Sequence, residues 1–422
     1  MADIPGAARA VLGPGPGRET VLTGRTWVSG HGALLVDDLG HEYVDLGSGT
    51  MTQLLGHAHP SVVAAVQQQA QELENVHDCP TPVRERAETA LRRLLPGSLT
   101  SIAFFNTGSE AVEAAVRLVA AQAPAGRRRI AALRGGFHGK TRGSRSLVMW
   151  DVGTEPASAA TMGYPAYCYR CPFGLSYPQC DVRCARLTVA QVVSRPDVAA
   201  LVAEPVPGSA GVLVPPPEYW QIVADGCQQN DVVLVADEVL TGGGRVGAFL
   251  AASVLGFEPD VVILAKGLAS GYPVSAVAAT AAVGTAESWA AAGGTSTTYG
   301  GSTVPLAAAA ATLTELANTP AGLGELVEIF ADGLDRIGRA ACVGEVRHLG
   351  LLGAIEVVHD RASRRPSPEM ADRIVTGAAV RGVRVLPGGH MLRLAPPLVI
   401  EPGQLRHALD VLADVVTGMS TR

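Results

Sequence analysis

The stretch Val261-Val262-Ile263-Leu264-Ala265-Lys266-Gly267 decides the predicted fold. Its five leading apolar residues are typical of a buried parallel strand, which is covered on both faces. Lys266 follows at once, so its amine is expected at a strand end, where α/β proteins bind ligands. An apolar setting lowers a lysine pKa, and the neutral amine can then form a Schiff base with a carbonyl group. The plainer alternative is a strand-end lysine that reaches back to water.

Lysine is rare in this chain: Lys140 and Lys266 are the only two in 422 residues. About thirty residues upstream of Lys266, a second apolar run, 232–236, ends at Asp237. A carboxylate there can keep the ring nitrogen of pyridoxal phosphate (PLP) protonated, which makes the ring an electron sink. Asp237 alone is a weak signal, and its spacing from Lys266 strengthens it.

A third strand pattern, 102–105, runs into Asn106-Thr107-Gly108-Ser109-Glu110 and then into a helical pattern. Free N–H groups and the dipole at the start of that helix could hold a phosphate. The alternative is an ordinary helix cap, with Thr107 or Ser109 bonding to the local backbone.

The order of the predicted elements indicates an α/β fold. Runs typical of strands are separated mostly by stretches long enough for helices, which predicts a largely parallel sheet; they cover residues 102–105, 130–133, 200–203, 232–236, 261–265 and 275–280. A short hairpin is expected near the start, at 33–36 and 43–46. After residue 315 the pattern changes to helix, strands, helix, strands and a final amphipathic helix; these strands are expected at 343–348, 351–357, 383–386 and 392–394.

Composition excludes several classes of protein. The mass of 43.4 kDa is ample for a substantial core, and the net charge of −6 favours neither nucleic acid nor a membrane surface as a partner. The start has no signal-peptide pattern, and no apolar run is long enough to span a bilayer. We therefore expect a cytoplasmic enzyme.

Cysteine is unevenly placed along the chain. Four of the seven cysteines, Cys168, Cys171, Cys180 and Cys184, lie in a segment rich in proline and tyrosine. Such a cluster can bind zinc, form disulfides or stay as free thiols, and the sequence leaves these alternatives open. We assign no metal ligand, and we expect an insertion near the mouth of the active site.

At this point the chain resembles the class III, or omega, aminotransferases, which are PLP enzymes of fold type I. The resemblance covers nearly the whole chain and rests on several spaced motifs: Gly56-His57-Ala58-His59-Pro60, Phe137-His138-Gly139, Glu204-Pro205, Asp237 to Gly247, Ala265 to Leu268, Thr298 to Gly301, and Arg393 with Pro396-Pro397. It implies a large domain with a mostly parallel seven-stranded sheet and a smaller α+β domain. The expected parts are an N-terminal arm and hairpin belonging to the small domain (1–50), the large PLP-binding domain (51–315) and the C-terminal small domain (316–422).

The resemblance also implies roles for individual residues. Lys266 would bind PLP and shuttle a proton, Asp237 would pair with the ring nitrogen, and Glu204 would orient residues around the ring. The remaining cofactor contacts would come from Gly108, Ser109, Phe137, His138 and Thr298. Thr298 would reach the phosphate from the neighbouring subunit, which implies a homodimer.

Three residues are expected to bind substrate. Arg393 matches the arginine that binds the substrate α-carboxylate, and its alternative is an interdomain ion pair. Lys140 stands where members acting on ω-amino acids often carry an arginine, and it could hold a distal carboxylate only as a point charge. Met51 belongs to a loop that would shape the pocket. Ser209 stands where glutamate-using members have a second glutamate. This departure argues against a pair of glutamate and an ω-amino acid, and it leaves room for pyruvate or for an amine without a carboxylate.

We therefore expect a PLP-dependent aminotransferase that moves an amino group from a primary amine or amino acid to a 2-oxo acid by a ping-pong mechanism. The cysteine segment is reminiscent of members in antibiotic biosynthesis, so an amino sugar is one candidate donor. An epimerase or racemase using Lys266 to remove and return a proton is the alternative. A PLP-bound scaffold without catalysis fits less well. A nicotinamide dehydrogenase is poorer still, because no Gly-x-Gly-x-x-Gly appears between a first strand and its helix.

Overall fold

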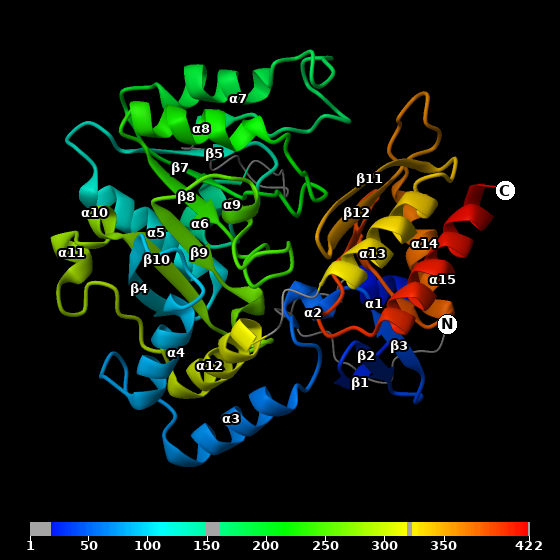
Figure 1. Ribbon diagram of the computed structural model, residues 1–422, viewed down its shortest axis with the longest axis horizontal. Helices are drawn as coiled ribbons and strands as arrows, with labels where there is room; N and C mark the ends of the chain where they lie inside the picture. Colours follow the sequence, from blue (N-terminus) through cyan, green and yellow to red (C-terminus); the bar gives the residue numbers. More distant parts are fainter. Residues whose placement is uncertain (1–17, 149–160, 319–322, 421–422) are drawn as a thin grey trace, which may run out of the picture.

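The computed structural model describes residues 18–148, 161–318 and 323–420. Its centre is a seven-stranded sheet in the order β4-β10-β9-β8-β7-β5-β6 (Figure 1). The strands are β4 Leu99–Phe105, β5 Arg129–Leu133, β6 Thr161–Gly163, β7 Val198–Ala203, β8 Val233–Asp237, β9 Val261–Leu264 and β10 Ser275–Thr280. Strand β10 runs antiparallel to β4 and β9, and the other neighbours pair in parallel. The predicted mostly parallel sheet is confirmed.

Apolar side chains cover both faces of this sheet because successive residues of a strand point to opposite sides. In β8, Leu234 packs with one core cluster and Val235 with the other. Helix α5 covers one face, and helices α3, α4, α8 and α12 cover the other. The helical elements of this part are α3 Pro60–Glu72, α4 Pro82–Arg92, α5 Gly108–Gln122, α6 Arg142–Ser146, α7 Arg183–Thr188, η1 Val189–Val193, α8 Glu218–Gln229, α9 Ala251–Val254, η2 Lys266–Ala269, α10 Ala281–Gly284, α11 Glu287–Ala290 and α12 Thr303–Asn318.

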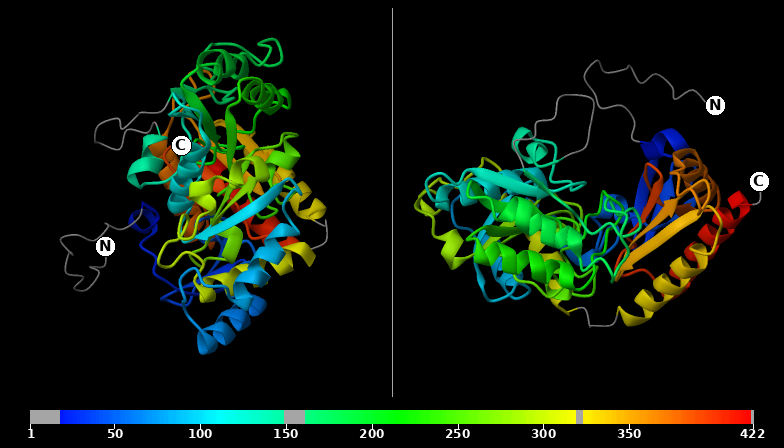
Figure 2. Two further views of the ribbon diagram at one scale, coloured as in Figure 1. Left: turned by 90° about the vertical axis from the view of Figure 1, so that its left-hand side faces the viewer. Right: turned by 90° about the horizontal axis from the view of Figure 1, so that it is seen from above.

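A second lobe combines the two ends of the chain. Figure 2 shows the blue N-terminal strands beside the orange and red C-terminal elements. Its strands form two sheets, β1-β2-β3-β13 and β11-β12-β15-β14, and one core cluster draws residues from both ends of the chain. Its elements are α1 Arg18–Thr23, β1 Trp27–His31, β2 Leu34–Asp37, β3 Glu42–Asp45, α2 Ser48–Met51, α13 Gly324–Ile337, β11 Val343–Leu349, β12 Leu352–Val357, α14 Pro368–Val380, β13 Val383–Arg384, β14 Leu386–Gly388, β15 Met391–Leu394 and α15 Pro402–Ser420.

Three details differ from the sequence expectation. Strand β1 was not predicted, because its residues show no apolar alternation and it depends on pairing with β2. Strand β6 was also missed, since it has only three residues at the sheet edge. The single strand predicted at 383–386 is wrong: β13 pairs with β3, and the chain then changes sheets so that β14 pairs with β15. The domain boundaries after residues 50 and 315 stay predictions, and residues 1–17 of the arm lie outside the described ranges.

Candidate active site

A cavity of about 620 Å³ lies at the carboxyl ends of the parallel strands. Lys266 follows β9, Asp237 ends β8, Glu204 follows β7, and α5 begins shortly after β4. Parallel strands bring their carboxyl ends to one edge, which explains why these residues meet. The cavity brings together every site residue predicted from the sequence except Thr298: Met51, Gly108, Ser109, Phe137, His138, Lys140, Glu204, Asp237, Lys266 and Arg393.

Lys266 lies partly buried where β9 gives way to the short helix η2. Burial lowers the pKa of its amine, while the carboxylates of Glu204 and Asp237 act in the opposite direction. Its backbone adopts φ 42°, a left-handed conformation that is uncommon for a residue other than glycine. Strain of this kind gathers at functional sites. Burial thus makes the amine lose its proton more readily than a solvated lysine would.

Asp237 and His138 form a buried pair in the cavity wall. His138 Nδ1 lies 2.7 Å from Asp237 Oδ2, and both residues are only 3% exposed. Burial lowers the pKa of His138, but the hydrogen bond and charge of Asp237 outweigh it, so the pKa is raised overall. Asp237 Oδ1 also accepts the backbone N–H of Val239. These contacts fix the plane of the Asp237 carboxylate.

Glu204 is a second buried carboxylate in the same wall. Its Oε1 accepts the backbone N–H of Phe137 at 2.8 Å, and its Oε2 accepts that of Gly208 at 3.0 Å. Burial raises the pKa of Glu204, against the nearby His138. The carboxylate therefore ties the turn that carries Phe137 to the end of β7.

The start of α5 faces the cavity with its first backbone N–H groups. Thr107 and Glu110 form a reciprocal capping box, so the predicted helix cap exists and is made by Thr107. The following N–H groups, those of Gly108 and Ser109, have no partner within a helix. A Cβ on Gly139 would collide with the Ser109 hydroxyl, which shows how closely the two segments approach.

Arg393 reaches the cavity from β15 in the second lobe. Its Nε is buried without a hydrogen-bond partner among the described residues. Burial lowers the pKa of Arg393, and the charge of Glu204 opposes that shift. The ion pair offered as its alternative role is not found in the described ranges. Lys140 lies exposed at the rim, and Met51 is buried with φ 63°.

Thr298 does not line the cavity. It is exposed, and its carbonyl accepts a hydrogen bond from Asn75 Nδ2 at 3.0 Å. Sequence reasoning also missed several lining residues, which include Thr50, Asn106, Tyr272 and Leu386. Tyr272 lies beyond the motif around Lys266, which ends at Leu268. Leu386 gave no signal, because its strand is remote in sequence.

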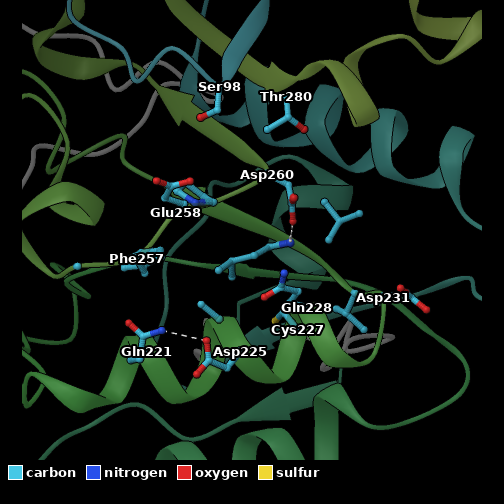
Figure 3. Close-up of a pocket in the computed structure, with 16 residues that line it drawn as sticks. Ser98, Gln221, Asp225, Cys227, Gln228, Asp231, Phe257, Glu258, Asp260 and Thr280 are labelled. Carbon is cyan, nitrogen blue, oxygen red and sulfur yellow. Dashed lines mark hydrogen bonds between the residues drawn. The ribbon is translucent and has the colours of Figure 1, made fainter.

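A second cavity of about 630 Å³ lies at the opposite ends of the strands (Figure 3). Its lining includes Asp225, Asp231, Glu258 and Asp260 and no Lys, Arg or His. Asp260 Oδ2 accepts the backbone N–H of Leu234 at 2.8 Å, so it ties β8 to the start of β9. This cavity has no amine that could form a Schiff base with a carbonyl compound, so the cavity that contains Lys266 is the candidate active site.

The cysteine segment differs from its expectation. None of residues 164–184 lines the active-site cavity; Cys168, Cys171, Cys180 and Cys184 surround a small cavity of their own and are free thiols. Within the described ranges, no three His, Cys, Asp or Glu side chains are grouped as a metal site. Nor does any described helix have the length and apolar character needed to cross a membrane.

Residues 18–416 match the family model for class III aminotransferases. The chain is 32% identical over 410 residues to the 4-aminobutyrate aminotransferase of Mycobacterium leprae, covering 91% of this chain and 89% of the relative. It is 34% identical over 403 residues to the acetylornithine aminotransferase of Corynebacterium efficiens, covering 93% and 92%. The chain belongs to the class III aminotransferase family.

Solved structures agree with this assignment. An omega transaminase from Pseudomonas jessenii superposes with a TM-score of 0.87 at 25% identity, covering 94% of this chain and 93% of that one. An amine transaminase from an uncultivated Pseudomonas species, solved with PLP, gives 0.85 at 28% identity, covering 94% and 95%. The protein is therefore a PLP-dependent aminotransferase of fold type I that uses an amine donor and a 2-oxo acid acceptor. The epimerase alternative has no counterpart among these relatives.

The residues of the cavity fit PLP. A helix start with close-packed glycine at Gly139 suits a phosphate, the fixed Asp237 carboxylate suits a protonated ring nitrogen, and Lys266 suits the aldehyde carbon. When bound, PLP supplies the carbonyl group that takes up the amino group and the ring that accepts electrons from the substrate.

Proposed function

We propose that this aminotransferase takes its amino group from an amine whose far end is anionic and passes it to a 2-oxo acid bound through Arg393. The proposal rests on Arg393, whose buried Nε has no partner among the described residues. A planar guanidinium aimed into a cavity suits a carboxylate, because it can donate two parallel hydrogen bonds.

Lys140 supports the anionic donor. It lies exposed at the cavity rim, and its ammonium is a point charge that attracts an anionic group without fixing its orientation. Ser209 lines the cavity and carries no charge that could neutralise Arg393. Taken by itself this favours an amine without a carboxylate, and Lys140 is the observation that argues for the anionic donor. Two of the relatives are named for 4-aminobutyrate and 5-aminovalerate, which are amines with a distal carboxylate. We extend this class of donor to the present chain.

The remaining roles divide between chemistry and positioning. Lys266, with its lowered pKa, moves the proton at the reacting substrate carbon. Asp237 binds the ring nitrogen, and His138 holds Asp237 in its plane. Glu204 acts as a positioning residue, since its hydrogen bonds join the turn of Phe137 to Gly208, and the ring of Phe137 would cover the cofactor.

A homodimer completes the site in this proposal. Thr298 is exposed and remote from its own cavity, as a residue that serves the partner subunit would be. Gel filtration and a Thr298→Ala variant test this: the variant is expected to stay dimeric and to bind PLP more weakly. A cytoplasmic location, an amino-sugar donor and a role in antibiotic biosynthesis stay predictions, because no contact described above selects them.

The test of the donor is the absorbance spectrum of the PLP-loaded protein. We expect 4-aminobutyrate or 5-aminovalerate to bleach the cofactor band, and pyruvate or 2-oxoglutarate to restore it. A Lys140→Ala variant is expected to raise KM for these donors but not for n-butylamine, which lacks the carboxylate. Bleaching by n-butylamine or glucosamine alone would contradict the anionic donor.

A further inference from the structure

The segment that follows β6 crosses from the large lobe to the second lobe. Tyr167 donates its hydroxyl to Glu356 Oε2 at 2.6 Å, and Arg170 Nε donates to Glu356 Oε1 at 2.5 Å. Glu356 lies in β12 and is fully buried. In Figure 1 the green loops near α7 extend towards the orange strands β11 and β12. These contacts join two lobes whose motion would alter the active-site cavity.

Glu356 has further partners on its own sheet. Arg347 Nη1 donates to Oε2 at 2.8 Å, and His390 Nε2 lies 3.5 Å from Oε1. Arg347 also bonds back to the large lobe, since its Nε donates to the carbonyl of Gly211 at 2.8 Å. Both carboxylate oxygens are therefore held by donors. Removal of one donor leaves a buried carboxylate with poorer compensation.

The start of the crossing segment is fixed to the large sheet. Tyr164 N donates to the Thr188 hydroxyl at 2.8 Å, and the Tyr164 carbonyl accepts from the buried Tyr219 hydroxyl at 2.7 Å. Gly163, one residue earlier, pairs with Leu133 in β5. The segment thus transmits the position of the seven-stranded sheet to Glu356.

Glu356 is also tied in register to Arg393. Strands β12 and β15 pair so that Glu356 faces Met391 and Ala354 faces Arg393. Arg393 is then only two residues along β15 from the partner of Glu356. A rigid β-ladder over this short span passes a displacement of one residue to the other.

We propose that Glu356, held by Tyr167 and Arg170, is a positioning residue that fixes Arg393 relative to Lys266 and so sets the affinity for carboxylate-bearing substrates. This inference rests on the proposed binding of the 2-oxo acid by Arg393. It also gives a function to the segment that contains the cysteines: the segment connects the lobes and does not line the pocket.

The chain offers a matched pair of variants for the test. Tyr167→Phe removes one hydroxyl that bonds Glu356, whereas Tyr169→Phe removes a neighbouring buried hydroxyl that has no partner in the described ranges. The assay is steady-state turnover of the PLP-loaded protein with the accepted 2-oxo acid, pyruvate or 2-oxoglutarate, varied. We expect Tyr167→Phe to raise KM for the 2-oxo acid about tenfold, or about 1.4 kcal/mol, with kcat within about twofold. Tyr169→Phe should change neither value.

A double-mutant cycle separates positioning from a general loss of structure. In an Arg393→Lys background, Tyr167→Phe is expected to add less than about twofold to KM, because the carboxylate contact is already weakened. An equal rise in both backgrounds, or a Tyr167→Phe variant that behaves like Tyr169→Phe, overturns the inference. If Arg393→Lys itself leaves KM unchanged, it is the proposed role of Arg393 that fails. Arg170→Lys, checked by thermal unfolding, serves as the second variant should Tyr167→Phe not fold.

Discussion

Replacement of His138 by alanine is expected to lower kcat about 10-fold to 100-fold. The side chain is completely buried, and its Nδ1 lies 2.7 Å from the carboxylate of Asp237. A hydrogen bond to a charged group contributes about 1.5 to 3 kcal/mol, and each 1.4 kcal/mol of barrier is a factor of about ten in rate. The full factor applies if the bond acts mainly in the transition state, where Asp237 would stabilise charge on the ring nitrogen.

A second substitution at the same place separates the hydrogen bond from the charge of the ring. The side-chain amide of His138→Asn can occupy the place of Nδ1 and donate to Asp237, but it cannot carry a proton charge. We expect His138→Asn to recover most of the rate if orientation of Asp237 is what matters. His41→Asn is the control, because His41 also approaches an aspartate, Asp37, through Nδ1 but lies exposed and far from the cavity.

The assay is steady-state turnover of the PLP-loaded variants, with thermal unfolding as the check on folding. His41→Asn is expected to match the unmodified protein. A His138→Ala variant that keeps its fold and a kcat within twofold of the unmodified protein would refute the positioning role of the pair.

Three further outcomes follow from the geometry. Gly139→Ala should weaken PLP binding about tenfold in a fluorescence titration, because the new Cβ would collide with the Ser109 hydroxyl at the start of α5. Gly126→Ala is the control: its φ is also positive but its surroundings are open, and it should leave the affinity for PLP unchanged. Burial raises the pKa of Glu238 to about 7 in the native state, so the native state binds this proton more tightly than the unfolded chain does. The free energy of unfolding should therefore fall by roughly 3 kcal/mol as pH rises from 4.5 to 7. Chemical denaturation should find no such fall in Glu238→Gln. Asp45→Asn should destabilise the fold by about 1.5 to 3 kcal/mol in the same assay, because the buried guanidinium of Arg384 then keeps Glu19 as its one ionised partner in the described ranges; a loss under 1 kcal/mol would contradict this.

Much of the fold follows from short apolar runs. Each of the six strands expected in the large sheet exists, because continuous apolar segments have few stable places other than a covered sheet. Strands β1 and β6 were not predicted. The residues of β1 show no apolar alternation, β6 has only three residues, and both depend on pairing with neighbouring strands of the fold. The split of residues 383–386 between two sheets depends on contacts with β3 and β15, which no local pattern encodes.

The site was predictable where chemistry coincides with a strand end. Lys266 and Asp237 were predicted from their apolar runs, Gly108 and Ser109 from a strand-to-helix pattern, and the other seven site residues from the family resemblance; of these eleven, only Thr298 lies outside the cavity. The left-handed backbone at Lys266 and the buried bond between His138 and Asp237 were not visible, because they depend on tertiary packing. The contact of Tyr167 with Glu356 joins residues 189 positions apart, a pairing that sequence patterns do not reveal.

We propose that Lys266 carries the cofactor, and the scarcity of lysine makes this directly measurable. Borohydride reduction of the PLP-loaded protein fixes the cofactor to the amine that holds it, and peptide mass spectrometry then locates the added mass. We predict one phosphopyridoxyl group on Lys266, unchanged in a Lys140→Arg variant and absent in Lys266→Arg. A label on Lys140, or none on either lysine after saturation with PLP, would contradict the account.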